Sequence, residues 1–215
     1  MAEPTDATGL TGLRRSPLAH LAERMRTATV TGARGVRLTE RPYVTMVNLR
    51  VDPATDAVAP ATEAAGRIGE VLGAPLPREC GRTSASEAHT VLWLGPDEWL
   101  VLSQAEGAVV AAELREALGG DPGSVVDVSA NRTTLELTGL AARQVLEKGC
   151  PLDLHPRAFG PGRAVSTTVG PVAALLWQTD DAPTYRLLPR ASFADYLARW
   201  LIDAMSEYGG PQPLR

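Results

Sequence analysis

The fold is most readable in residues 125–156, VVDVSANRTTLELTGLAARQVLEKGCPLDLHP. The segment opens with a β-branched run, 125–128, which predicts a short strand. Ser, Ala, Asn and Arg at 129–132 supply turn chemistry, and Leu135 and Leu137 then alternate with polar residues. This alternation predicts a second, half-buried strand over 133–138.

A two-turn helix is predicted next, over 141–148, because three apolar residues share one face: Ala142, Val145 and Leu146. Gly149 is expected to end this helix in a left-handed conformation, with Pro151 just beyond it. No residue in this segment is an obvious nucleophile or metal ligand. The segment therefore organises the fold rather than displaying chemistry.

Size and composition indicate a soluble globular protein. The 215 residues, 44% hydrophobic and 21% charged, fit one large domain or two small fused units with a sizeable core. The formal net charge of −4 gives no electrostatic reason to expect nucleic acid. No apolar run reaches the roughly 18 residues of a membrane span, so no membrane is expected.

The N-terminal sequence and the cysteine content indicate the cellular compartment, and the two ends of the chain are expected to be irregular. The N-terminal sequence lacks a basic region followed by an apolar core, and with only Cys80 and Cys150 we expect reduced thiols in the cytoplasm. Residues 1–15 are expected to be disordered and 209–215 to form a tail. Ser16 and Pro17 predict a helix start, either of a helix docked on its own domain or of an arm on a partner chain.

The two halves of the chain repeat one order of elements: strand, helix, hairpin, helix. The predicted elements are 43–51, 61–72, 90–103 and 108–118, then 133–138, 141–148, 172–188 and 193–208. This order predicts an α+β fold of two pseudo-symmetric split β-α-β-like units, with helices on one face of antiparallel sheets. The repeats, 36–120 and 124–208, would form a single domain, 16–208.

The final helix has the clearest apolar stripe, at spacings of three and four residues: Phe193, Tyr196, Leu197, Trp200, Leu201, Ala204 and Tyr208. Ser192 and Asp195 resemble a capping box at its start. We expect this stripe to face the core.

The chemistry-bearing residues form no recognisable constellation. His20, His89 and His155 lack metal-ligand spacing, and neither Cys80 nor Cys150 has a motif that would lower its pKa. Gly-rich phosphate loops and nucleophile elbows are absent from the sequence. We therefore assign no catalytic, cofactor-binding or metal residue to this chain.

Asp127 and the hairpin tryptophans each have two possible roles. Asp127 precedes a turn, where its carboxylate could face a cleft or accept turn N–H groups, and the structural role is favoured. Trp93 and Trp99 flank the first hairpin turn, and Trp177 occupies the second hairpin. Aromatic side chains there usually belong to the sheet core, whereas an exposed pair would mark an interface.

Read together, several motifs resemble the gamma subunits of heterotetrameric sarcosine oxidase, over residues 16–208. The similarity is carried by SPL at 16–18, LGPDEWLVL at 94–102, the segment 126–156, Gly170-Pro171-Val172, and YRLLPRASFADYLARWLIDA at 185–204. More distantly, the sequence resembles the folate-binding domain of glycine-cleavage aminomethyltransferases. This resemblance implies an aminomethyltransferase folate-domain-like fold, itself built from duplicated units.

One departure from the folate-using relatives stands out. They carry a carboxylate just after the Gly-x-Val of the returning strand, whereas this chain has Ala173-Ala174-Leu175. The resemblance therefore implies a non-catalytic structural subunit whose partners are alpha, beta and delta subunits, alpha most directly. FAD, FMN, NAD, zinc and tetrahydrofolate would belong to those partners. The implied reaction is oxidative demethylation of sarcosine to glycine, with hydrogen peroxide and formaldehyde or methylene-tetrahydrofolate as products.

Two other functions remain open at this stage. The first is a stand-alone folate-binding aminomethyltransferase-like enzyme, which the missing carboxylate disfavours. The second is a tRNA-modification factor of the same superfamily, which the sequence disfavours because Lys148-Gly149-Cys150 continues as Pro-Leu-Asp-Leu instead of the reactive-cysteine motif.

Overall fold

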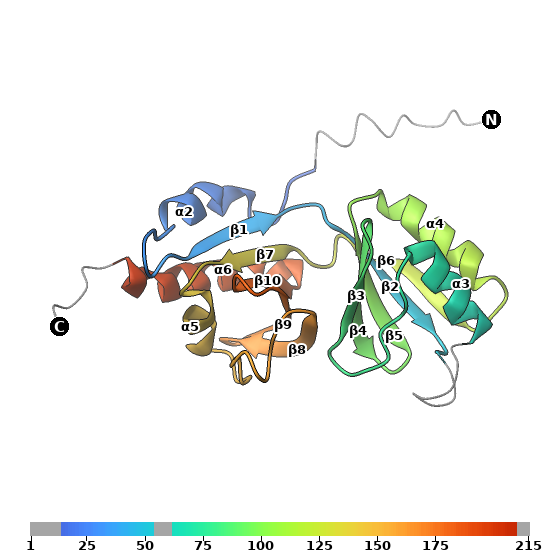
Figure 1. Ribbon diagram of the computed structural model, residues 1–215. Helices are drawn as coiled ribbons and strands as arrows, with labels where there is room; N and C mark the ends of the chain where they lie inside the picture. The colour runs from blue at the N-terminus through green and yellow to red at the C-terminus, as the bar shows by residue number, and fades with distance from the viewer. Residues whose placement is uncertain (1–13, 54–61, 210–215) are drawn as a thin grey trace, which may run out of the picture.

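A computed structural model describes residues 14–53 and 62–209 (Figure 1). These residues form two five-stranded sheets in which all neighbouring strands are antiparallel. Sheet I has the order β1 (Arg37–Arg41), β7 (Thr134–Thr138), β10 (Thr184–Pro189), β9 (Val172–Asp180) and β8 (Arg163–Val169). Sheet II has the order β3 (Thr83–Ala85), β4 (His89–Gly95), β5 (Glu98–Ser103), β2 (Thr45–Val51) and β6 (Gly123–Asp127).

Helices cover one face of each sheet. Sheet I carries α2 (Ala22–Thr27), α5 (Ala142–Glu147) and α6 (Ala191–Met205), with short 3-10 turns η1 (Ala19–Leu21) before α2 and η2 (Ser206–Tyr208) after α6. Sheet II carries α3 (Glu63–Leu72) and α4 (Gly107–Leu118). The predicted α+β fold, with antiparallel sheets and helices on one face, is therefore confirmed.

Alternation along the strands divides the core into three clusters. Leu135 and Leu137 face the helices of sheet I, as the sequence predicts, and Val47 and Leu49 do the same in sheet II. A third cluster lies between the two sheets and includes Met46, Leu92, Leu100, Leu175, Trp177 and Leu188. Apolar burial thus both holds the helices to their sheets and joins the two sheets.

The two sheets have matching strand arrangements, because β2 lies between β5 and β6 as β7 lies between β10 and β1. In sheet II, Val47 pairs with Val101 on one side and with Asp127 on the other. In sheet I, Leu135 pairs in the same way with Leu187 and with Glu40. The repeat inferred from element order is therefore a structural repeat, strand by strand.

The edge strand of each sheet comes from the other predicted repeat. Strand β1 belongs to the range 36–120 yet completes sheet I, whereas β6 belongs to 124–208 yet completes sheet II. The chain crosses between sheets directly after each of these strands. Tyr43 lies in the first crossing with a φ of 60°, a left-handed conformation that is uncommon for a bulky residue.

Several local predictions are wrong. Gly149 is not left-handed, although Gly73, which ends α3, is (φ 63°), and Gly119, which ends α4, has a positive φ of 64° without the left-handed helical ψ. No side chain caps α6, because Asp195 bonds His20 and Arg199 instead. Ser16 does not cap the first helix either.

The hydroxyl of Ser16 donates instead to Glu40 at 2.6 Å, across to β1. The N-terminal helix consequently docks on its own domain, and the buried side chains Leu18, Leu21 and Met25 join the core of sheet I. Of the predicted tails, residues 1–13 and 210–215 lie outside the described residues, as does the predicted start of α3 at 61.

Candidate functional site

A cavity of about 150 Å³ lies where the chain first crosses between the sheets. Sheet I contributes Arg41, Thr134 and Arg186 to its wall, and sheet II contributes His89 and Ser103. These side chains come together because β1, β7 and β10 are neighbours, and because the β4–β5 ends of sheet II lie against them. The sequence analysis did not identify this site.

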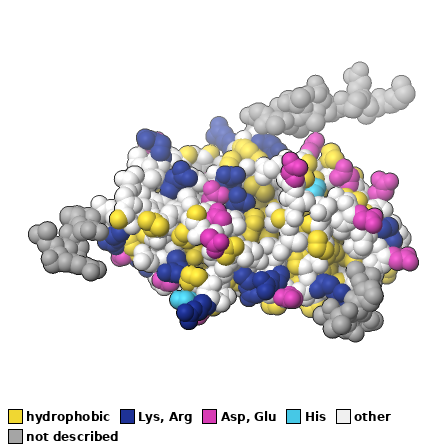
Figure 2. All heavy atoms as spheres, in the orientation of Figure 1, with side chains coloured by type: hydrophobic (Ala, Val, Ile, Leu, Met, Phe, Trp, Pro, Cys, Tyr) yellow, Lys and Arg dark blue, Asp and Glu magenta, His cyan; other side chains and the backbone are white. Residues whose placement is uncertain are grey.

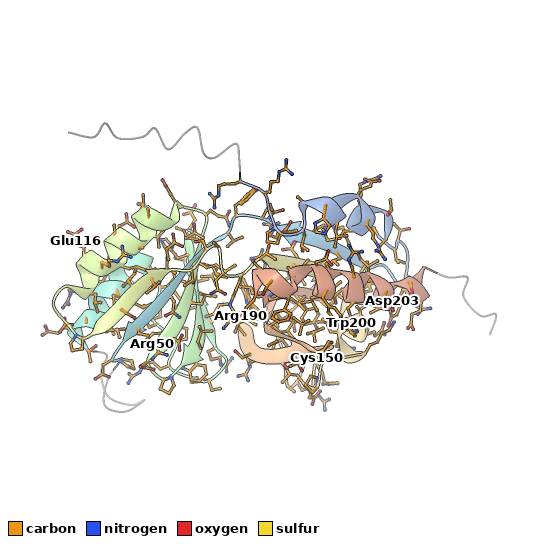
Figure 3. All side chains as sticks on the ribbon, turned by 180° about the vertical axis from the view of Figure 1, so that it is seen from behind. Arg50, Glu116, Cys150, Arg190, Trp200 and Asp203 are labelled. Carbon is orange, nitrogen blue, oxygen red and sulfur yellow. The ribbon has the colours of Figure 1, made fainter. Side chains whose placement is uncertain are left out.

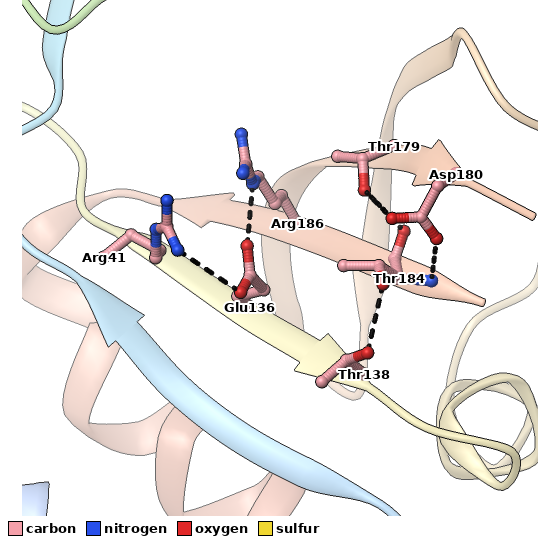
Figure 4. Close-up of polar contacts among 7 residues, drawn as sticks. All are labelled: Arg41, Glu136, Thr138, Thr179, Asp180, Thr184 and Arg186. Atoms are coloured by element: carbon pink, nitrogen blue, oxygen red, sulfur yellow. Dashed lines mark hydrogen bonds and ion pairs between the residues drawn. The ribbon is translucent and has the colours of Figure 1, made fainter. Parts of the chain in front are cut away.

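An ion cluster forms one side of the cavity (Figure 4). Glu136, on β7, accepts a hydrogen bond from Arg186 Nε at 3.1 Å and lies 3.7 Å from Arg41 Nη1. The Arg186 guanidinium also stacks over Trp177, 5.0 Å from the ring centroid. Arg186 is therefore fixed on two sides, whereas Arg41 is held by one long ion pair.

Beyond this cluster, the polar side chains of β9 and β10 stabilise a turn (Figure 4). Asp180 accepts hydrogen bonds from the backbone N–H groups of Ala182 and Thr184, at 3.0 and 3.2 Å. Thr184 and Thr138 share a hydroxyl hydrogen bond of 3.0 Å. This carboxylate closes the hairpin and makes no contact that indicates chemistry.

Asp127 has the structural role that the sequence analysis favoured. Its Oδ1 accepts from the backbone N–H of Ser129 at 2.9 Å and from the Ser129 hydroxyl at 2.5 Å. A side chain at Gly107, the first residue of α4, would collide with the carboxylate. Asp127 therefore joins the turn after β6 to the start of α4.

The three histidines have different surroundings and different contacts. His20 Nε2 contacts Asp195 Oδ1 at 2.6 Å and ties the N-terminal helix to α6. His155 Nδ1 accepts a loop N–H from Arg157 at 3.2 Å. His89 lines the cavity between the sheets, and its Nδ1 is buried without a hydrogen-bond partner in the described chain.

Among the described residues, Asp195 is the carboxylate whose pKa is most clearly shifted. The hydrogen bond from Arg199, followed by that from His20, lowers the pKa of Asp195 from 3.8 to about 2. The group lies at the surface and serves as an anchor between helices.

Both cysteines are free thiols. Cys80 is exposed in a loop, whereas Cys150 is buried in the α5–α6 lobe (Figure 3). Within residues 14–53 and 62–209, no three His, Cys, Asp or Glu side chains are placed to hold a metal ion.

The tryptophans belong to the core, as predicted. Trp99 is fully buried, and its Nε1 donates to the Pro77 carbonyl at 2.7 Å. Trp93 is half-buried against the same cluster, and Trp177 is buried between the sheets.

The apolar stripe of α6 faces the core only in part. Leu197 and Leu201 are fully buried, but Phe193 and Tyr196 are each 53% exposed, so that part of the prediction is wrong. Other large exposed apolar side chains among the described residues are Tyr43, Val71, Val109, Val126 and Leu140.

In the face shown in Figure 2, acidic side chains gather over the end that holds α3 and α4.

Ala173 and Ala174, which follow Gly170-Pro171-Val172, differ in their surroundings. Ala173 is exposed on β9, whereas Ala174 is 4% exposed and packs in the core beneath the helices. Adjacent residues of this strand thus point to opposite faces.

The described helices include none long and apolar enough to cross a membrane.

Comparison with known proteins gives consistent results. Residues 54–207 match the model of the sarcosine oxidase, gamma subunit family. The chain is 47% identical over 202 residues to a sarcosine oxidase subunit gamma from Arthrobacter sp., covering 94% of both chains. It is 48% identical over 199 residues to that of Corynebacterium sp. (strain P-1), covering 92% of this chain and 93% of the relative.

Solved structures agree. A chain of heterotetrameric sarcosine oxidase from Corynebacterium sp. U-96, in complex with pyrrole 2-carboxylate, is 42% identical, with a TM-score of 0.86 over 94% of this chain and 100% of that one. Aminomethyltransferase T of the glycine cleavage system from Bartonella henselae shares the fold at 15% identity, with a TM-score of 0.63 over 88% of this chain and 57% of that one. Sequence and structure together establish that this chain belongs to the sarcosine oxidase gamma subunit family.

Proposed function

We propose that this chain is a non-catalytic structural subunit of a heterotetrameric sarcosine oxidase. In this role it stabilises the assembly, and its most direct partner is the alpha subunit, with beta and delta completing the complex. The close similarity to a chain of a heterotetrameric enzyme supports the assignment.

The observation that carries the structural role is how the candidate chemical groups are used. Asp127 closes a turn, His20 anchors a helix through Asp195, and Asp180 closes a hairpin. Each of these three side chains therefore bonds a neighbour in its own fold, and they do not form an acid–base pair aimed at a common reacting atom.

The exposed apolar side chains supply surface for a partner. Phe193 and Tyr196 lie three residues apart at the start of α6, and aromatic side chains are enriched in the cores of protein interfaces. Ordering these two side chains against another subunit would bury apolar area that the isolated chain leaves in water.

The reaction of the whole assembly is proposed to be oxidative demethylation of sarcosine to glycine in the cytoplasm. Hydrogen peroxide would form, and the methyl carbon would leave as formaldehyde or as methylene-tetrahydrofolate. We place FAD, FMN, NAD, zinc and tetrahydrofolate in the partner subunits. For this chain, a folate site would need a carboxylate where Ala173 and Ala174 stand.

Co-expression of the partner subunits with and without this chain tests the proposal. We expect the incomplete complex to elute as smaller or aggregated species in size-exclusion chromatography and to lose sarcosine turnover. Adding back the purified chain should restore both. Normal assembly and turnover without the chain would refute the structural role.

A calorimetric titration of the isolated chain with tetrahydrofolate separates this proposal from the stand-alone enzyme. Micromolar binding would favour a folate-using activity in this chain, whereas a structural subunit gives no saturable heat.

A further inference from the structure

We propose that the cavity between the two sheets binds a small monocarboxylate. The cavity lies beside the first crossing of the chain, between Arg41 and Thr134 of sheet I and His89 of sheet II. Its volume of about 150 Å³ equals that of cavities that accept a molecule the size of benzene. A ligand of about six non-hydrogen atoms therefore fits.

Arg41 provides the principal recognition group. A guanidinium has five N–H donors, and the partner of Arg41 within the described residues is Glu136, at 3.7 Å. That distance is too long for a hydrogen bond, so the donors of Arg41 remain available. The planar fork of arginine matches the two oxygens of a carboxylate.

Thr134 provides the second observation. Its side chain lines the cavity, the residue is only 2% exposed, and its Oγ1 has no hydrogen-bond partner in the part of the chain that the structure describes. On the opposite, sheet II side of the cavity, the buried Nδ1 of His89 is likewise unpartnered among the described residues. Buried polar atoms are nearly always hydrogen-bonded, so two unpartnered atoms lining one cavity point to a polar ligand.

The surrounding charges restrict the ligand further. Arg186 is held in place through Nε by Glu136 and through its guanidinium plane by Trp177. The guanidinium of Arg41, by contrast, makes no hydrogen bond within the described residues and can turn to a ligand. Glu136 adds a negative charge beside the cavity, and Glu87 adds another to its exposed wall. A dianion would meet both carboxylates, whereas a monocarboxylate needs one guanidinium and a hydroxyl donor.

The test is calorimetric titration of the full-length chain with sodium acetate, at constant ionic strength maintained with chloride. We expect saturable binding that the neutral isostere acetamide does not reproduce. Arg41→Gln should weaken acetate binding at least about tenfold, because it removes a charge-assisted hydrogen bond. Arg37→Gln, the same charge change at an exposed position on the same strand, should leave binding unchanged.

Thr134→Val separates a ligand site from a packing feature. It removes a buried, unpartnered hydroxyl at nearly constant volume, so the melting temperature of the free chain should stay level or rise. Acetate binding should nevertheless weaken. The proposal is overturned by the absence of saturable heat, by equal binding of acetamide, or by acetate affinity that Arg41→Gln and Thr134→Val leave intact.

Discussion

Gly149→Ala tests the close approach that joins the segment 125–156 to α6. A Cβ at Gly149 would lie 2.6 Å from Trp200 Cζ2, 2.8 Å from Cη2 and 3.0 Å from Gly170 N. Carbon atoms in contact normally stay about 3.5–4 Å apart, so the indole ring would have to move by roughly 1 Å.

The size of the effect follows from this geometry. Forcing one extra methyl group into a packed site typically destabilises a protein by about 1–3 kcal/mol. In a chain of this size, about 2 kcal/mol corresponds to a fall of about 4–8 °C in melting temperature. Gly66→Ala is the matched control, because Gly66 lies within α3 and a Cβ there meets nothing within 4 Å. That substitution should stabilise the chain by up to about 1 kcal/mol.

Thermal and urea unfolding of four proteins distinguish steric collision from other causes: wild type, Gly149→Ala, Trp200→Leu and the double variant. Leucine lacks the ring atoms that the new Cβ would meet, so Gly149→Ala should destabilise the Trp200→Leu background much less than the wild type. The contact with Gly170 N leaves a small residual effect. An equal loss in both backgrounds, or no loss in the wild type, would refute the reasoning.

Three further predictions concern the core, the absent carboxylate and the α6 anchor. Trp99→Phe should lower the free energy of unfolding by about 1–3 kcal/mol in urea titration, because it leaves a buried carbonyl unpaired; an unchanged midpoint would contradict this. Ala174→Asp should lower the free energy of unfolding by several kcal/mol, since it buries a charge. Ala173→Asp, on the exposed face, should change the free energy of unfolding by no more than about 0.5 kcal/mol. Similar urea midpoints for the two variants would contradict this. Because the pKa of Asp195 is lowered from 3.8 to about 2, its contribution to stability is present above pH 3.8 and is lost as the pH falls towards 2. Melting temperatures across that window should therefore fall more for the wild type than for Asp195→Asn, and parallel curves would show that the contacts of Asp195 with Arg199 and His20 contribute nothing.

The order of elements was predictable from the sequence because periodicity and turn chemistry are local. The alternation of Leu135 and Leu137 correctly identified β7 and its buried face. The hairpin tryptophans were correctly assigned to the core, since large aromatic side chains on a half-covered sheet are rarely left in water. Strand β3 is only three residues long and carries no alternation, so the sequence does not predict it.

Predictions that depended on tertiary partners failed. Asp195 has the spacing of a capping box with Ser192, but its carboxylate bonds two other side chains instead. Arg199 lies on the same face of α6, and His20 lies in the N-terminal turn η1. The apolar stripe of α6 was placed correctly at Leu197 and incorrectly at Phe193, because helical spacing does not reveal how far the opposite sheet extends beneath the helix. Gly149 does not adopt the predicted left-handed conformation; its missing Cβ instead makes room for the indole of Trp200.

The candidate cavity was hidden for a topological reason. Arg41, His89, Thr134 and Arg186 lie in four strands that span most of the chain, and no motif links them. One local signal was present. In β7 the residues that alternate with leucine are Thr134, Glu136 and Thr138, on the face away from the helices. A charged residue in the middle of a strand that has neighbours on both sides indicates ionic partners on those neighbours.

The strand exchange makes the two halves of the chain depend on each other. Each half lacks one edge strand of its own sheet, because β1 completes sheet I and β6 completes sheet II. A fragment ending after α4 would carry β1 without its partner β7 and would leave β2 unpaired along one edge. An unpaired edge strand exposes backbone N–H and C=O groups and tends to associate with other chains. The same crossing also places Arg41 beside the sheet II strands, so the connectivity that makes the two halves interdependent creates the cavity between them.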